Sequence, residues 1–249
     1  MSQINFRRTD FVAGQQSESL SADKKLVIAI DGPAASGKGT LARRLAERLG
    51  FAYLETGALY RAVALATLEI GGDPTQFKDV APALEIIKRN LTPELLENAA
   101  LRTPEVSAAS SQVAALPEVR EALRNYQRAF ALTPPEGFGG AVLDGRDIGT
   151  VVCPDADIKL FVTATPEVRA QRRYAESKQA CDGLTLEKVA ADIKARDARD
   201  AARKTSPMRA AEDAYVLDTT SLSIPEVLEE TMAVIRSKFL ERTAARVSA

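Results

Sequence analysis

A glycine-rich segment between an apolar run and an amphipathic helix constrains this chain more than any other feature. Residues 26–30 are Leu-Val-Ile-Ala-Ile, a β-branched run typical of a buried parallel strand. Apolar residues then recur at helical spacing over 38–49, and Gly50 is well placed to end that helix. The segment 32–40 between them, Gly-Pro-Ala-Ala-Ser-Gly-Lys-Gly-Thr, therefore has the spacing and the context of a phosphate-binding loop.

A loop of this kind binds phosphate mainly through its backbone. Glycines let the chain curl around the phosphates, and the N–H groups of the loop and the helix N-terminus point inward. Lys38 then places a charge between the β- and γ-phosphates, and Thr40 is a candidate for hydroxyl contact near Mg²⁺. The alternative, a glycine-rich turn without a ligand, is disfavoured by the flanking strand and helix.

Short apolar runs and helical patterns alternate along most of the remaining chain. Further strands are predicted at 51–54, 141–143, 158–163 and 215–217, and helices at 57–70, 166–180, 185–203 and 224–241. This alternation implies right-handed βαβ crossovers and a parallel sheet that is covered on both faces. We therefore predict an α/β protein with a three-layer αβα fold of the P-loop NTPase type and a five-stranded parallel sheet.

The segment 73–132 interrupts the alternation. Its patterns are nearly all helical, with breaks at Pro74, Pro93, Pro104 and Pro117. We expect this segment to form a helical insert over the ends of the strands, and residues 169–205 to form a second mobile element. Residues 25–245 are then one domain, preceded at 1–24 by a polar segment that we expect to be a flexible extension.

Composition excludes several classes of function. The chain has no histidine, which removes His-based triads, His metal sites and imidazole acid–base chemistry. Cys153 and Cys181 offer neither a disulfide framework nor a metal-binding spacing, so no protein metal site is predicted. No apolar run approaches the roughly 18 residues that span a bilayer, and 1–24 lacks the apolar stretch of a signal peptide. We expect a cytoplasmic protein without a membrane partner.

Charge is unevenly distributed along the chain. The formal net charge is −1, which gives no reason to expect a nucleic-acid partner, and nothing in the composition suggests more than a monomer. Between 169 and 209, however, eleven Lys or Arg stand against six Asp or Glu. A local basic patch in a near-neutral protein suits a small anionic ligand better than a long polyanion. A solvated helical surface is the alternative interpretation.

Two segments that follow predicted strands carry candidate ligand-binding residues. Thr56 and Arg61 open the helix after the second strand and could meet a second phosphate-bearing ligand. The alternative is a helix-capping threonine with an ordinary surface arginine. The segment 144–147, Asp-Gly-Arg-Asp, ends the third strand, where open α/β sheets bind ligands. The alternative there is a turn with a local Arg–Asp ion pair.

The basic stretch contains a third candidate group. Arg196, Asp200 and Arg203 stand at i, i+4 and i+7, on one face of a predicted helix, and Arg172 and Arg173 lie on the preceding helix. Guanidinium groups favour phosphoryl transfer because the transition state spreads charge over several oxygens. An exposed salt-bridge ladder is the alternative.

Taken together, these motifs resemble the bacterial cytidylate kinase family. The most specific are Gly-Lys-Gly-Thr (37–40), Glu-Thr-Gly-Ala-Leu-Tyr-Arg (55–61), Ser-Gln-Val-Ala-Ala-Leu-Pro-Glu-Val-Arg (111–120), Asp-Gly-Arg-Asp-Ile-Gly-Thr-Val-Val (144–152) and Arg-Asp-Ala-Arg-Asp-Ala-Ala-Arg (196–203). They occur in the family's order, and the resemblance covers most of 25–240. Family members often carry a small β-sheet insert, but 73–102 shows no alternating strand pattern. The extension before residue 25 is outside the resemblance.

The resemblance implies transfer of the γ-phosphate of MgATP to CMP or dCMP, with Mg²⁺ arriving with ATP. The insert would then bind the acceptor, and 169–205 would be a lid. The implied ATP-binding residues are Gly32, Pro33, Ala34, Ala35, Ser36, Gly37, Lys38, Gly39 and Thr40. The implied CMP-binding residues are Thr56, Arg61, Ser111, Arg120, Arg146, Asp147, Arg196, Asp200 and Arg203. The implied catalytic residues are Lys38, Arg146, Arg172, Arg196 and Arg203.

Within the implied CMP site, the residues divide by the part of the nucleotide they meet. Arg61, Arg146 and Arg203 would grip the acceptor phosphate. Arg196 with Asp200 would hold the ribose hydroxyls. Ser111, Arg120 and Asp147 would face the cytosine, whose N4 amine donor beside N3 and O2 acceptors complements a carboxylate plus a guanidinium.

Three other functions remain open at this point. The nearest is a kinase for another small acceptor, such as UMP, AMP or shikimate. A nucleotide-binding switch protein is a second, although the chain has no Asn-Lys-x-Asp motif for guanine. A nucleic-acid-binding role is the third, and it rests only on the basic stretch.

Overall fold

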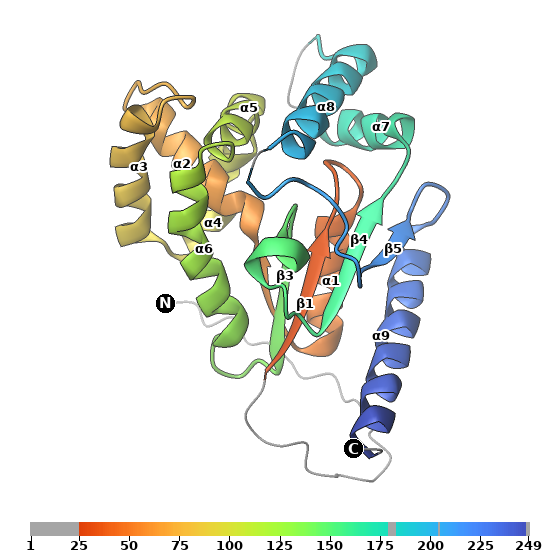
Figure 1. Cartoon of the computed structure of the whole chain (residues 1–249). Helices are drawn as coiled ribbons and strands as arrows, with labels where there is room; N and C mark the ends of the chain where they lie inside the picture. The colour runs from red at the N-terminus through yellow and green to blue at the C-terminus, as the bar shows by residue number, and fades with distance from the viewer. Residues whose placement is uncertain (1–24, 179–182, 204, 248–249) are drawn as a thin grey trace, which may run out of the picture.

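The computed structural model of the chain describes residues 25–178, 183–203 and 205–247. Five parallel strands form one sheet in the order β2-β3-β1-β4-β5. The strands are β1 (Leu26–Asp31), β2 (Ala52–Glu55), β3 (Gly140–Gly145), β4 (Ile158–Thr163) and β5 (Tyr215–Asp218). The predicted five-stranded parallel sheet is confirmed, with β1 at its centre (Figure 1). The predicted extension at 1–24 and Cys181 lie outside the described residues.

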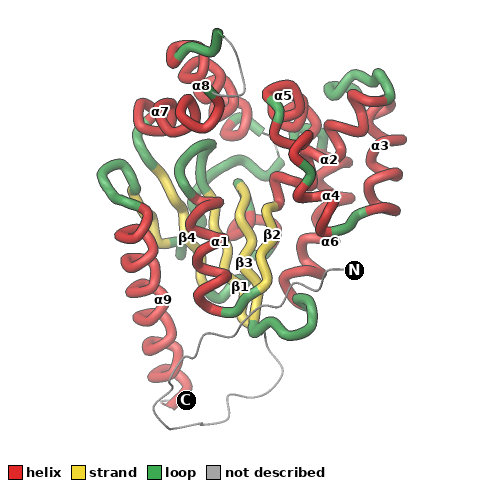
Figure 2. Tube along the Cα trace, turned by 180° about the vertical axis from the view of Figure 1, so that it is seen from behind, coloured by secondary structure: helices red, strands yellow, loops and turns green. Residues whose placement is uncertain are grey.

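Alternate side chains of β1 point into two buried clusters on opposite faces of the sheet. Ile28 and Ile30 pack in the cluster that includes α1 (Lys38–Leu49) and α9 (Ile224–Val247). Figure 2 shows both helices on that face. Val27 and Ala29 belong to the other cluster, which α2 (Thr56–Glu69) shares. Because successive side chains of a strand point to opposite faces, a wholly apolar strand requires this three-layer arrangement.

The predicted helical insert consists of helices joined by short turns and irregular segments. It contains α3 (Phe77–Asn90), α4 (Pro93–Glu97), the 3₁₀ turn η1 (Ala99–Arg102), α5 (Pro104–Val113) and α6 (Pro117–Leu132). Proline begins α4, α5 and α6, a position where its missing N–H costs no hydrogen bond. The insert shares the cluster of α2, so it packs against one face of the sheet as well as rising beside the strand ends.

Two helices, α7 (Pro166–Ser177) and α8 (Leu186–Ala201), lie over the carboxyl ends of the strands (Figure 1). They pack on each other through a small cluster that contains Ala170, Val189 and Ile193. We call this pair of helices the lid. In the described ranges, no helix is long and apolar enough to cross a membrane.

The predicted placement of Arg203 on the helix with Arg196 and Asp200 is wrong. The helix ends at Ala201, and the chain then folds back so that the N–H of Met208 donates to the carbonyl of Asp200 at 2.9 Å. Arg203 therefore reaches Asp200 from an irregular segment. An i, i+4, i+7 pattern does not reveal where a helix ends when the competing hydrogen bond comes from a residue further along the chain.

Candidate active site

The phosphate-binding loop follows β1 and ends at the first turn of α1, as predicted. Gly32 has a φ of 150°, and a Cβ atom there would lie 2.0 Å from the carbonyl oxygen of Val162. Gly37 has a φ of 85° and stands directly before α1. The two glycines let the loop turn tightly against β4 and present the unpaired N–H groups of the α1 N-terminus to an anion.

Lys38 and Asp144 lie together beside this loop. Burial lowers the pKa of Lys38 to about 7, and the nearby Arg146 guanidinium adds to that effect. Burial raises the pKa of Asp144 to about 6, although the nearby charge of Lys38 acts to lower it. The hydroxyl of Tyr53 donates to Asp144 Oδ1 at 3.1 Å. Asp144 is part of the candidate segment predicted at the end of β3, but the resemblance gave it no role in the site.

Arg61, Arg146 and Arg196 line the same cavity as Lys38, and Arg203 joins this group through Asp200. Arg61 is paired with Glu55 at 2.6 Å, and Arg146 is paired with Asp200 at 3.0 Å. Arg203 forms a second ion pair with Asp200. The Arg146–Asp200 pair joins segments that are 54 residues apart in sequence, and the side chain of Asp200 is only 1% exposed. The alternatives of a local Arg–Asp turn and an exposed salt-bridge ladder are therefore excluded.

Arg196 differs from the other three arginines in forming no ion pair with another described residue. Burial lowers its pKa to about 9, with Arg146 contributing in the same direction. Its Nε is buried and has no hydrogen-bond partner among the described residues. Arg196 is half-buried at the cavity, and a buried guanidinium nitrogen without an acceptor is costly unless a ligand supplies one. The arrangement is thus suited to an anion with several oxygens.

A second polar cluster lies deeper in the protein. Arg120 donates to Asp147 at 2.5 Å and stands over the ring of Tyr60 at 5.5 Å. Arg120 is 4% exposed and Asp147 is 5% exposed. The Nε of Arg120 and the Oγ of Ser111 are buried without partners among the described residues. The structure therefore brings Ser111, Arg120 and Asp147 into the interior with unused donors.

The model of the family described as cytidylate kinase matches residues 28–237 of this chain. The chain belongs to the cytidylate kinase family. Cytidylate kinase of Granulibacter bethesdensis is 51% identical over 215 residues, which cover 86% of this chain and 99% of that protein. Cytidylate kinase of Rhodospirillum rubrum is 50% identical over 213 residues, with 86% and 98% covered. That of a Methylobacterium species is 53% identical over 214 residues, with 86% and 98% covered. The chain is an enzyme of the phosphotransferase class.

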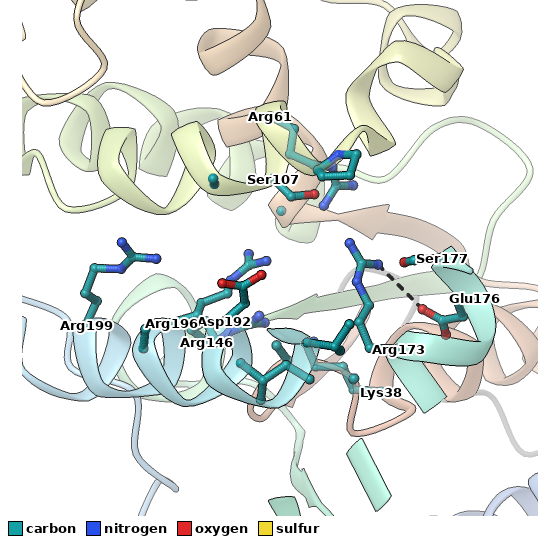
Figure 3. Close-up of a pocket in the computed structure, with 18 of the residues that line it drawn as sticks. Lys38, Arg61, Ser107, Arg146, Arg173, Glu176, Ser177, Asp192, Arg196 and Arg199 are labelled. Atoms are coloured by element: carbon teal, nitrogen blue, oxygen red, sulfur yellow. Dashed lines mark ion pairs between the residues drawn. The ribbon is translucent and has the colours of Figure 1, made fainter. Parts of the chain in front are cut away.

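The open part of the site in this cytidylate kinase family member is a cavity of about 450 Å³ between the lid, the phosphate loop and the insert. Figure 3 shows Arg61 and Ser107 on one side of it, facing Arg196, Arg146 and Lys38 on the other. Of the residues implied to bind CMP, only Arg61, Arg146 and Arg196 line this cavity. The other six do not line it: Thr56, Ser111, Arg120, Asp147 and Asp200 are buried, and Arg203 is half-buried.

Two predicted site residues make contacts that the sequence did not suggest. The hydroxyl of Thr56 donates to the carbonyl of Asp144 at 2.8 Å, so it ties α2 to β3 and does not cap the helix. Arg172 donates to the hydroxyl and the carbonyl of Thr219, at 2.9 and 2.7 Å. It thereby joins α7 to the end of β5. Arg173, one residue later, is the one that lines the cavity.

Metal-binding groups are sparse. Within the described ranges, no group of three or more Asp, Glu, Cys or His side chains is arranged to hold a metal ion. Two of the oxygen groups next to the phosphate loop are the Thr40 hydroxyl, which lines a second cavity, and the carboxylate of Asp144, which lies against Gly39. These are hard oxygen ligands of the type that Mg²⁺ takes when most of its ligands are phosphate and water.

Proposed function

We propose that this enzyme transfers the γ-phosphate of MgATP to CMP or dCMP, giving ADP and CDP or dCDP. The observation that carries the proposal is the buried Arg120–Asp147 pair, which lies next in sequence to the phosphate-binding candidate Arg146. A buried carboxylate and guanidinium with unused hydrogen-bonding capacity need a partner of matching pattern. Family membership supports the same acceptor.

Cytosine has the pattern that this pair requires. Its N4 amine can donate to the carboxylate of Asp147, while N3 and O2 can accept from Arg120 and from the hydroxyl of Ser111. Uracil reverses donor and acceptor at positions 4 and 3. Its binding would leave buried groups of the protein mismatched, which costs far more than the loss of an exposed contact.

The acceptor phosphate would then lie in the cavity lined by Arg61 and Arg146, with Arg203 held next to Arg146 by their shared partner Asp200. Arg61, Arg146 and Arg203 would bind its oxygens, and Arg196 with Asp200 would hold the ribose. The three arginines reach the site from α2, from the segment after β3 and from the segment after α8. Charge-assisted hydrogen bonds from several directions fix an anion in one orientation, which is the main requirement for in-line attack.

The donor triphosphate would occupy residues 32–40. One oxygen of the acceptor phosphate forms a bond to the γ-phosphorus, and the bond from that phosphorus to the β–γ bridging oxygen breaks, releasing ADP. Lys38, Arg172 and Arg196 would stabilise the charge that spreads over the transferring group. No side chain needs to act as nucleophile, so the absence of histidine is no obstacle.

Mg²⁺ would enter with ATP and neutralise charge on the β- and γ-phosphate oxygens. The Thr40 hydroxyl and the Asp144 carboxylate are suited to hold it, the latter either directly or through water. ATP would restore the charge of Lys38, whose pKa is lowered in the free site.

We place the reaction in the cytoplasm, where both nucleotides are found. Every residue invoked comes from one chain, so a monomer is sufficient.

These roles assign a separate function to each part of the domain formed by residues 25–245. The insert about 73–132 would bind the acceptor, and the lid, about 169–205, would close over the phosphates. Closure excludes water and limits wasteful hydrolysis of ATP. Thr56 would act through the backbone of Asp144, to which it donates, by holding the end of β3 in place.

The Lys38→Met variant tests the role of the loop. We expect its kcat with CMP to fall by at least a thousandfold with an unchanged fold, because the variant loses the charge beside the transferring phosphate. Lys88→Met on α3 is the matched control, since Lys88 is exposed and remote from the cavity. Near-normal turnover by folded Lys38→Met would contradict the assignment of the donor site.

A further inference from the structure

One buried arginine connects both helices of the lid to the phosphate loop. Arg169 on α7 is 6% exposed, and its Nε donates to the carbonyl of Ala164 at 3.0 Å. Its Nη1 donates to the carbonyl of Ala34 in the phosphate loop at 3.2 Å. The same nitrogen is paired with the carboxylate of Asp197 on α8. One side chain thus joins both helices of the lid to the loop.

Asp197 completes this contact from the other helix. Its Oδ1 lies 3.5 Å from the backbone nitrogen of Ala34, whose N–H points toward it. Both polar groups of one loop residue, its N–H and its carbonyl, are therefore directed at the Arg169–Asp197 pair. We call these two side chains the clasp.

The next loop residue makes an apolar contact with the same part of the lid. Ala35 has a φ of 58°, which is unusual for a residue with a Cβ atom. It packs against the cluster of Ala170, Val189 and Ile193 that holds the lid helices together. The lid thus contacts the loop at two consecutive residues, through polar groups at Ala34 and through apolar side chains at Ala35.

The clasp lies one residue away from a group implied in catalysis. Arg196 immediately precedes Asp197 on α8, and the buried Nε of Arg196 has no hydrogen-bond partner among the described residues. The position of its guanidinium therefore depends on where the backbone of α8 is held. Of the two clasp residues, neither lines the cavity, so neither is placed to touch a substrate.

We propose that Arg169 and Asp197 are positioning residues, whose ion pair holds α8 on the phosphate loop so that Arg196 meets the transferring phosphate. The proposal rests on the phosphoryl transfer proposed above. A buried ion pair contributes little net stability, because the cost of desolvating the two charges offsets most of their attraction. An apolar pair would stabilise the fold equally well, so a positioning role explains why this contact is charged. Displacement of a catalytic group by about 1 Å can cost about a hundredfold in rate.

A double-mutant cycle tests the clasp. The variants are Arg169→Gln, Asp197→Asn and the two combined, with Glu187→Gln as control because Glu187 is an exposed carboxylate on the same helix. We expect each single variant to lower kcat at least tenfold, while KM for ATP changes less than about threefold because the loop's own phosphate contacts remain. The double variant should be no more than about threefold slower than the slower single variant.

Hydrogen exchange of the nucleotide-free protein supplies a readout that does not depend on activity. Amides of α8 should exchange faster in both single variants than in the wild type and in Glu187→Gln. This holds whether or not the wild type phosphorylates CMP, so failure of the proposed function is recognised separately by wild-type turnover. Three results would overturn the proposal. They are multiplicative losses in the double variant, unchanged exchange in α8, or a normal or increased kcat once α8 has loosened.

Discussion

Removal of the Arg120 guanidinium separates the structural role of the buried pair from its proposed role in base recognition. In Arg120→Met the side chain keeps much of its apolar length, but Asp147 is left as a buried carboxylate at 5% exposure. Breaking one partner of a buried ion pair costs about 3–5 kcal/mol. Coulomb's law with an effective dielectric constant of about 20 gives about 4 kcal/mol for charges roughly 4 Å apart. We therefore expect the free energy of unfolding to fall by about 4 kcal/mol.

The double variant Arg120→Met/Asp147→Leu is expected to regain most of that stability, since it buries no unpaired charge. Its activity with CMP should remain lost, because neither new side chain can hydrogen-bond to cytosine. Urea denaturation measures the first quantity, and coupled ADP release measures the second. Lys88→Met is the control for an exposed ion pair, the pair with Glu85 at 2.8 Å, and should change stability by less than about 1 kcal/mol.

Two results would refute this reasoning. A loss below about 1 kcal/mol in Arg120→Met would mean that Asp147 is not held as a buried charge by Arg120. A double variant that phosphorylates CMP at the wild-type rate would mean that the pair does not recognise the base.

The other predictions concern the phosphate loop. ATP binding should take up protons above pH 7, because the pKa of Lys38 is lowered to about 7 in the free site and the phosphates of ATP favour the charged form of Lys38. The affinity for ATP should therefore fall as the pH rises from 7 to 8. Calorimetry in buffers of different ionisation enthalpy measures the uptake, which should be near zero at pH 6 and absent from Lys38→Met. Gly32→Ala should cost more than about 3 kcal/mol of stability, because its Cβ would lie 2.0 Å from the Val162 carbonyl. Gly50→Ala, at a φ of 65° with open space around it, should cost only about 1–2 kcal/mol by urea denaturation, and equal losses would contradict the account.

Local chemistry made much of the fold predictable. The helix predicted at 38–49 has those bounds in the structure because a glycine with positive φ stands at each end, Gly37 at 85° and Gly50 at 65°. The strand predicted at 158–163 is also confirmed. In both cases the bounds are set by residues within the segment or next to it, which is the information that a single sequence holds.

The ion-pair and hydrogen-bond partners of the site residues were harder to predict, because they come from segments that are distant in sequence. Asp200 pairs with Arg146, which is 54 residues earlier in the chain, and Arg120 pairs with Asp147. No local pattern indicates such pairs. Asp31 is a similar case, since its carboxylate accepts the N–H groups of Ile148 and Gly149 at 2.8 and 2.7 Å. The motif order supplied the candidate residues, but only the packing of β1 beside β3 shows how Asp31 meets the segment after β3.

Coupled ADP release with MgATP and each of CMP, dCMP, UMP, AMP and GMP tests the central claim most directly. We predict turnover confined mainly to CMP and dCMP, because only cytosine satisfies the buried groups of Ser111, Arg120 and Asp147 together. Equal turnover with UMP would contradict the proposed recognition of the base. Absence of turnover with CMP and dCMP, from folded protein that binds ATP, would contradict the proposed function itself.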